Sequence, residues 1–162
     1  MSELSQLLAA HPRARRFVEI GGYEGGSILA LALRFANRDI DFFSVESFMG
    51  NLDGTMDGHR LPSRVRYLEN LARFPSLRAR LLPGDSQLAA SLFDDASVDF
   101  VFIDGCHATP AVLRDISVWL PKLAPGGILA GDDYNWDSVR RAVDAELDVL
   151  VTPSGIVWWC RT

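Results

Sequence analysis

Strand-like and helix-like segments alternate along almost the whole of this 162-residue chain. The segment at 98–103, VDFVFI, is a nearly continuous apolar run, which is typical of a parallel strand covered on both faces. The segment at 27–36, SILALALRFA, is apolar nearly all round, as expected of a helix packed on a sheet. Such alternation predicts an α/β fold with right-handed crossovers between parallel strands. We therefore expect a Rossmann-like three-layer sandwich.

The predicted sheet has seven strands, mostly parallel, and ends in a C-terminal antiparallel hairpin. The expected strands are 17–21, 41–45, 79–82, 98–103, 128–131, 148–151 and 156–160. After an N-terminal capping helix within 1–15, the expected helices are 27–36, 62–73, 86–93, 110–123 and 139–147. Thr109 is the expected N-cap of the fourth of these, before Pro110, and Asn135 or Asp137 that of the last. The length fits a single domain over 1–162.

Charge and hydropathy exclude several classes of partner. The net charge of −5 argues against nucleic acid, because phosphate binding needs a dominant basic surface. Charged residues interrupt every apolar run before it reaches membrane-spanning length, and the N-terminal segment lacks the pattern of a signal peptide. We therefore expect a cytoplasmic protein without a membrane partner, with Cys106 and Cys160 reduced. The arginines between positions 60 and 80 form either a solvated face or an anion-binding or subunit-contact face, and a homodimer stays open.

A glycine-rich segment, GGYEGGS at 21–27, follows the first expected strand and opens a helix. Glycines let the backbone approach a ligand and point amide groups at it, although tight turns need glycine anyway. Glu19 is a carboxylate within an otherwise apolar strand, where an unpaired charge is costly. Glu46 ends the second strand, where an acidic residue can bind ribose hydroxyls. Together these features predict a cofactor-binding α/β domain.

The chain also resembles a known family in five segments between about Phe17 and Tyr134: VEIGGYEGGS, SVES, PGDSQ, VDFVFIDGCH and LAPGGILAGDDY. It is similar to class I S-adenosylmethionine-dependent methyltransferases, in particular the O-methyltransferase branch that includes catechol O-methyltransferase and macrocin-type sugar enzymes. The resemblance implies that S-adenosylmethionine is the cofactor and that a small-molecule hydroxyl, on a sugar or natural product, is the acceptor. In that family pattern Glu19 and the glycine loop hold the methionine moiety, Glu46 the ribose, and Asp85 and Ser86, with Gln87, the adenine. The cofactor-binding residues so implied are Glu19, Gly21, Gly22, Tyr23, Gly25, Gly26, Ser27, Glu46, Ser47, Gly84, Asp85, Ser86, Asp104 and Gly105.

Carboxylates also follow the fourth and fifth expected strands. Asp104 follows one, and Asp132 and Asp133 follow the other, and the methyltransferase strand order makes these strands neighbours about 4.8 Å apart. Because three converging carboxylates repel one another unless a cation lies between them, they predict a site for Mg²⁺ or another divalent cation. Such a metal would bind the acceptor hydroxyl and lower its pKa. His107, three residues after Asp104, is the candidate general base. Capping roles for the aspartates and an ordinary loop role for the histidine stay open.

Two further features bear on the acceptor. The segment 48–59, FMGNLDGTMDGH, contains three glycines and is expected to be a mobile loop that could close over substrate, with His59 a weaker site candidate. Trp136 is a candidate wall of the acceptor pocket. The alternatives are a non-catalytic or partner-dependent subunit of the same fold, an NAD-binding oxidoreductase and a metal-dependent hydrolase. The oxidoreductase leaves the acidic cluster unexplained, and the hydrolase leaves the glycine loop and Glu46 unexplained.

Overall fold

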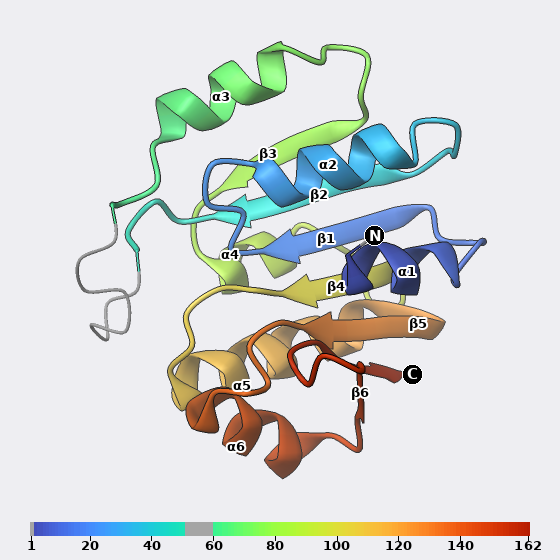
Figure 1. Cartoon of the computed structure of the whole chain (residues 1–162), viewed down its shortest axis with the longest axis vertical. Helices are drawn as coiled ribbons and strands as arrows, with labels where there is room; N and C mark the ends of the chain where they lie inside the picture. The colour runs from blue at the N-terminus through green and yellow to red at the C-terminus, as the bar shows by residue number, and fades with distance from the viewer. Residues whose placement is uncertain (1, 51–59) are drawn as a thin grey trace.

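The described residues form one seven-stranded sheet between two layers of helices (Figure 1). The structure is a computed structural model and describes residues 2–50 and 60–162. The strand order is β3-β2-β1-β4-β5-β7-β6, with β1 to β5 parallel and β7 antiparallel to both of its neighbours. The strands are β1 (Arg16–Ile20), β2 (Asp41–Glu46), β3 (Ala79–Pro83), β4 (Val98–Ile103), β5 (Leu123–Gly131), β6 (Leu150–Val151) and β7 (Trp158–Arg161).

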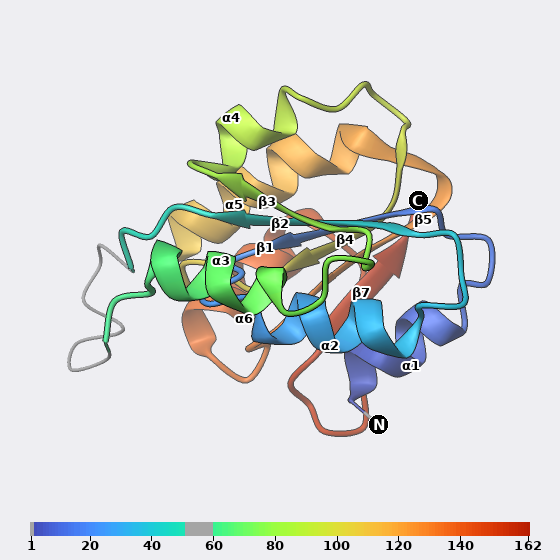
Figure 2. The same cartoon turned by 90° about the horizontal axis from the view of Figure 1, so that it is seen from above.

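Helices cover both faces of this sheet. Figure 2 shows α1, α2 and α3 on one face and α4 and α5 on the other, and buried residues of α6 share a core cluster with α5. The described helices are α1 (Glu3–Ala9), α2 (Gly26–Arg34), α3 (Arg64–Ala72), α4 (Ser86–Ala90), α5 (Thr109–Trp119) and α6 (Asp137–Glu146), with a 3₁₀ turn at Leu120–Lys122. None of them is long and apolar enough to cross a bilayer. The expected three-layer sandwich with its closing antiparallel pair is confirmed.

The core has one part on each face of the sheet. On the α1–α3 face, the rings of Phe17 and Phe100 stack with centroids 5.1 Å apart. On the opposite face, Trp119 of α5 and Trp158 of β7 are fully buried. Both faces of β4 are therefore covered, which explains why its sequence is apolar throughout.

Two predicted helix caps are wrong. The residue at the N-cap of α5 is Ala108, and Thr109 is the first helical residue. The Thr109 hydroxyl instead donates to the carbonyl oxygen of Ser138 at 2.8 Å, which links α5 to α6. The N-cap of α6 is Trp136, without a side-chain cap hydrogen bond. The Thr109 hydroxyl, which the local sequence assigns to the helix cap, is therefore used in a contact with a distant part of the chain.

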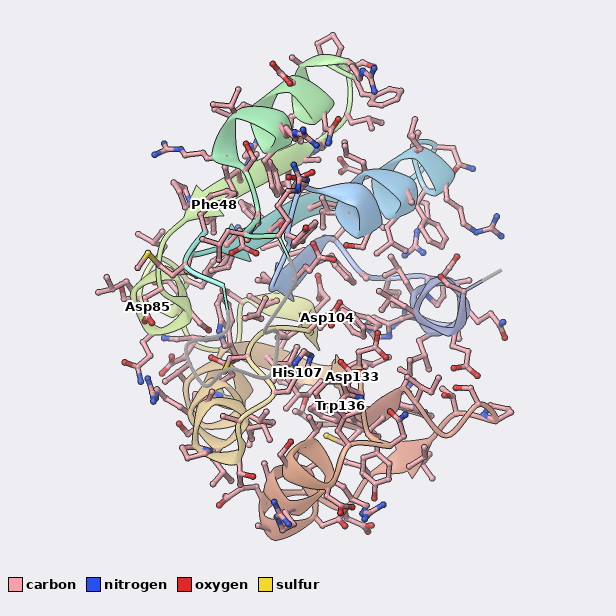
Figure 3. The ribbon with its side chains drawn as sticks, turned by 60° about the vertical axis from the view of Figure 1, so that its left-hand side comes forward. Phe48, Asp85, Asp104, His107, Asp133 and Trp136 are labelled. Carbon is pink, nitrogen blue, oxygen red and sulfur yellow. The ribbon has the colours of Figure 1, made fainter. Side chains whose placement is uncertain are left out.

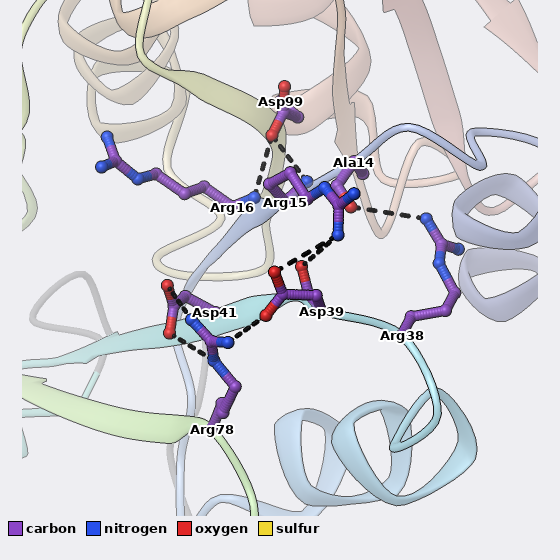
Figure 4. A network of polar contacts seen from close by, with 8 residues as sticks. All are labelled: Ala14, Arg15, Arg16, Arg38, Asp39, Asp41, Arg78 and Asp99. Carbon is purple, nitrogen blue, oxygen red and sulfur yellow. Dashed lines mark hydrogen bonds and ion pairs between the residues drawn. The ribbon is translucent and has the colours of Figure 1, made fainter.

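Ionic and polar contacts join the elements at the amino ends of the strands (Figure 4). Asp99 accepts hydrogen bonds from the backbone amides of Arg15 and Arg16 at 2.7 and 2.9 Å. Arg78 forms two hydrogen bonds of 2.9 Å with the carboxylate of Asp41, between β2 and the start of β3. The Arg38 guanidinium donates to backbone carbonyls at the end of α1 and beyond it. This network stabilises the amino ends of the strands, which lie opposite the predicted site at their carboxyl ends.

Candidate active site

The glycine turn after β1 packs against the end of β4. Gly21 has φ of 91°, and a Cβ atom there would collide with the carbonyl oxygen of Asp104. A Cβ at Gly22 would likewise collide with the Ser44 hydroxyl. Gly21 therefore needs glycine for both its conformation and the close approach of the Asp104 backbone, and Gly22 needs it for the close approach of Ser44. The turn brings the loop before α2 next to Asp104 and Gly105.

The other residues of the glycine segment begin α2. Gly25 is its N-cap, with φ of 82°, and Gly26 is its first residue, where an added Cβ would meet no atom within 4 Å. Tyr23 lies in the left-handed region with φ of 49°. Its side chain is partly exposed and donates a hydrogen bond to the carbonyl oxygen of Arg60 at 3.0 Å. Contact of these residues with a cofactor stays a prediction.

Glu46, at the end of β2, is held by two backbone amides. Its Oε2 accepts from the amide of Tyr23 and its Oε1 from the amide of Phe48, each at 2.7 Å. A carboxylate has about four lone-pair positions, so two amides orient this group and leave acceptor capacity. Glu46 is 8% exposed and lines a cavity. It is therefore a fixed acceptor at the position predicted to bind ribose.

That cavity has a volume of about 140 Å³ and brings together much of the predicted cofactor set. Asp85 is the N-cap of α4, where its Oδ1 accepts from the amide of Gln87 at 2.8 Å. The far wall of the cavity comes from the loop after β4 and from α5, which supplies Arg114 and Asp115. The predicted residues that line it are Gly21, Glu46, Ser47, Gly84, Asp85, Ser86 and Gln87.

Glu19 is fully buried in the middle of β1 and lies beneath the glycine turn. Its carboxylate accepts hydrogen bonds from the hydroxyls of Ser44, at 3.0 Å, and Ser27. Burial raises the pKa of Glu19 to about 7, against the opposing effect of these two hydrogen bonds. Through Ser27 it fixes the first turn of α2. Its role toward the methionine moiety stays a prediction.

His107 and Asp133 connect the ends of β4 and β5. The Nε2 atom of His107 lies 2.7 Å from Oδ2 of Asp133, and Figure 3 shows the two residues beside Trp136 and near Asp104. Asp133 has a left-handed backbone with φ of 56°, and the His107 ring lies 4.7 Å from that of Trp136. One ligand atom from each of Asp104, His107 and Asp133 lies within 4.8 Å of the others. Two carboxylates and an imidazole in this arrangement could hold a divalent cation.

Asp132 lies outside the group of possible ligand atoms formed by Asp104, His107 and Asp133, and its predicted role as a metal ligand stays a prediction. The group that the structure forms takes His107 in place of Asp132. The Oδ1 atom of Asp132 accepts from the amide of Asp133 at 3.0 Å, and its side chain lines another cavity, of about 550 Å³. Asp133 has a left-handed backbone, and its carboxylate, unlike that of Asp132, is paired with His107.

The larger cavity also lies beside Asp104 and Ser27, and residues of α1, α2 and the β6–β7 connection line it. Burial raises the pKa of Asp104 to about 8, and the charges of Asp132, Glu19 and Asp133 add to the increase. A cation bound beside Asp104 would favour the charged form of this carboxyl. The larger cavity thus contacts Asp104, and the small cavity, lined by Gly21 and Cys106, lies at the same edge of the sheet.

Comparison with known proteins identifies the family. Residues 18–134, well over half of the chain, match the model of a family described as a methyltransferase domain. The chain belongs to this methyltransferase domain family. The predicted resemblance to class I methyltransferases is thereby confirmed, and neither the oxidoreductase nor the hydrolase alternative is supported.

Solved structures share the fold of this methyltransferase domain. The O-methyltransferase NovP aligns with a TM-score of 0.72 and 20% identity, over 96% of this chain and 74% of NovP. TomG, an O-methyltransferase of Streptomyces achromogenes solved with S-adenosylmethionine, aligns at 0.65 and 21% over 98% and 78%. PaMTH1 of Podospora anserina, solved with S-adenosylhomocysteine, aligns at 0.70 and 16% over 98% and 78%.

A curated relative is much longer than the methyltransferase domain described here. The protein y4gI of Sinorhizobium fredii, which is named uncharacterized, is 30% identical over 124 residues. The match covers 75% of this chain and 13% of y4gI.

Parts of the predicted acceptor region are outside the described residues of the methyltransferase domain. The predicted lid over 48–59 includes residues 51–59, and therefore His59, which are not described. Trp136 is described and is 37% exposed beside His107, as a wall of an acceptor pocket would be, but that role stays a prediction. A homodimer and a partner-dependent pocket also stay predictions.

Sequence reasoning missed Asp115, which lines the small cavity. This residue is in α5, between apolar residues that the helical spacing assigns to the core, namely Val112, Ile116 and Trp119. A carboxylate on the inward side of an otherwise apolar helix face is a signal for a buried polar function. The sequence pattern therefore indicates a buried carboxylate at Asp115, but it does not indicate that this residue lines a cavity.

Proposed function

We propose that the protein is an S-adenosylmethionine-dependent O-methyltransferase that acts on a hydroxyl group of a small molecule, such as a sugar or natural product. The observation that carries the proposal is the His107–Asp133 pair, which lies beside Asp104 at the same sheet edge as the predicted cofactor cavity. The family match supports methyl transfer. The O-methyltransferases among the solved structures of the same fold support oxygen as the target atom.

The proposed cofactor seat begins in the cavity beside Glu46. Glu46 would accept hydrogen bonds from the ribose hydroxyls, since two amides already orient its carboxylate. Asp85 and Ser86, at the start of α4, would bind the adenine edge. The methionine moiety would pass the glycine turn toward Ser27, which lines the larger cavity with Asp104. When bound, S-adenosylmethionine supplies an electrophilic methyl group.

His107 is the proposed general base. The contact of its Nε2 with Asp133 favours the tautomer in which Nε2 carries the hydrogen, so that Nδ1 accepts the proton of the acceptor hydroxyl. Asp133 orients the ring and stabilises the positive charge that it gains. Trp136 would support the acceptor beside the imidazole. Positioning by these residues supplies much of the rate, because methyl transfer is an in-line displacement.

A divalent cation fits the donor set of Asp104, His107 and Asp133. When bound, it would lower the pKa of the acceptor hydroxyl. Because the set contains an imidazole, it suits Mn²⁺ or another transition ion at least as well as the predicted Mg²⁺. His107 would then be a ligand through Nε2 and could not at the same time donate that hydrogen to Asp133. The metal and base roles of His107 are therefore alternatives that experiment can separate.

A thermal unfolding experiment tests the choice of cofactor. S-adenosylhomocysteine and NADH are each added at about a hundred times their dissociation constant, with and without Mg²⁺ or Mn²⁺. A ligand at that excess adds about 2.7 kcal/mol of stability, which raises the midpoint by a few degrees. Stabilisation by S-adenosylhomocysteine alone is the expected result. Stabilisation by NADH alone would contradict the proposal.

A further inference from the structure

The carboxylate of Asp115 lies at the wall of the small cavity and is not explained by the proposed roles above. Asp115 is 8% exposed, yet it is among the residues that line the cavity. It occupies the inward side of α5, whose other inward residues, Val112 and Ile116, are apolar and buried. A buried carboxylate is costly unless it has hydrogen-bond partners. Its position at the cavity wall therefore places a hydrogen-bond acceptor where a polar group of a ligand can reach it.

Ser86 and Trp119 fix the direction of the hydrogen bonds at Asp115. The indole Nε1 of Trp119 donates to the hydroxyl oxygen of Ser86 at 2.8 Å. Indole can only donate, so the Ser86 hydrogen is available for another acceptor, and hydrogen bonding by Ser86 lowers the pKa of Asp115. One hydroxyl donor uses only part of the acceptor capacity of a carboxylate. Asp115 thus retains acceptor positions at the cavity.

The charged groups that face Asp115 leave it an acceptor at neutral pH. Burial raises the pKa of Asp115 to about 6, the charge of Asp85 adds to the increase, and Ser86 and Arg114 oppose it. At pH 7.5 the carboxylate is therefore ionised and can accept hydrogen bonds but cannot donate them. Asp85 and Asp115 both line the cavity, where their carboxylates can accept hydrogen bonds from donor groups of a ligand, and Arg114 is the cation that lines it.

We propose that Asp115 is a specificity-determining residue that accepts a hydrogen bond from the exocyclic amino group of the cofactor's adenine and disfavours purines with an oxo group there. The inference rests on the proposed function, since it takes the cavity as the adenosine seat. A 6-oxopurine places a carbonyl oxygen where the amino group of adenine would be. Two acceptors then face each other in a buried site, and neither has a hydrogen to share.

Calorimetric titrations with S-adenosylhomocysteine and S-inosylhomocysteine test the proposal. The wild-type protein is expected to bind the adenine ligand at least about tenfold more tightly. In Asp115→Asn the side-chain amide can donate as well as accept, so this preference is expected to fall by about tenfold. Glu46→Gln is the matched control in the same cavity, because loss of a ribose contact should weaken both ligands by the same factor.

The outcomes separate the two levels of the inference. If the wild-type protein binds neither ligand, the proposed function itself fails. If S-adenosylhomocysteine binds and Asp115→Asn weakens both ligands equally, Asp115 only supports Ser86 and the specificity proposal is overturned. Asp115→Ser provides a second variant if the asparagine variant does not fold, as judged by far-UV circular dichroism. Its preference for adenine is also expected to fall, because serine can donate to the oxo group.

Discussion

The Nε2 atom of His107 lies 2.7 Å from Oδ2 of Asp133 and joins the loops that follow two adjacent parallel strands. The register of β4 and β5 pairs Ile103 with Gly131, so the residues after both strands leave the sheet at the same height. The carboxylate of Asp133 therefore orients the imidazole of His107. Such preorganisation is what proton transfer at a fixed site requires.

Loss of the His107 imidazole should remove turnover without removing cofactor affinity. In His107→Asn, the rate of S-adenosylhomocysteine formation with a panel of hydroxylated acceptors is expected to fall about 10²- to 10⁴-fold. Affinity for S-adenosylhomocysteine should change less than about twofold, because His107 does not line the small cavity. Asp133→Asn should give a smaller loss with the same pattern. Full activity in His107→Asn would exclude a role as base or as ligand.

The metal site predicts unequal effects of the three strand-end aspartates. Titration of the wild-type protein with Mn²⁺, followed by electron paramagnetic resonance, should give one site of defined stoichiometry. Asp104→Asn and Asp133→Asn are each expected to weaken Mn²⁺ binding by at least about tenfold, while Asp132→Asn changes it less. The exposed Asp94→Asn variant is the control. Equal losses in all three strand-end variants would restore the ligand set predicted from sequence, and an absence of binding would exclude the metal.

Two glycines of the glycine-rich segment, one in the turn after β1 and one in α2, should respond differently to alanine. Gly21→Ala is expected to lower the free energy of unfolding by about 2 kcal/mol or more, because its φ of 91° and the Asp104 carbonyl both exclude a Cβ. Gly26→Ala is expected to be neutral or to stabilise by about 0.5–1 kcal/mol, because its position is helical and open. Urea denaturation measures both. A tolerated Gly21→Ala would show that the turn is not packed as described.

Glu19 should make stability depend on pH. Its pKa is about 7 in the folded protein, against 4.5 as the ordinary value, so the folded state holds the proton more tightly. The free energy of unfolding should therefore fall as pH rises from about 4.5 to 7, by a total of about 3 kcal/mol. Glu19→Gln removes this contribution and should flatten the profile relative to the wild type. Parallel profiles from urea denaturation between pH 5 and 8 would contradict the buried, raised-pKa carboxyl.

Most of the fold could be predicted from the sequence, because the buried strands of the central sheet consist largely of apolar residues. The bounds of β4 were predicted to the residue, since both of its faces are covered. The caps were harder, because Thr109 donates to Ser138 in another element, a contact that no local pattern contains. In the candidate site, too, local patterns predicted some features and contacts between distant residues determined others. Placement of Glu46 and His107 at the strand ends followed from the strand pattern.

The relation of neighbouring side chains at a strand end could not be predicted so well. Asp132 and Asp133 are adjacent in sequence, yet Asp132 lines the larger cavity and Asp133 pairs with His107. The burial of Glu19 beneath the turn and the two amides that hold Glu46 likewise depend on backbone placement. A sequence pattern indicates which residues reach an edge, but the fold decides which of them face one another.

Calorimetric titration with S-adenosylhomocysteine tests the central claim most directly, because the claim depends on one cofactor at one seat. The account predicts one binding site per chain, an affinity that falls at least about tenfold in Glu46→Gln, and an unchanged affinity in the exposed control Glu69→Gln. Absence of binding to the wild-type protein, or equal affinity in Glu46→Gln and the wild type, would contradict it.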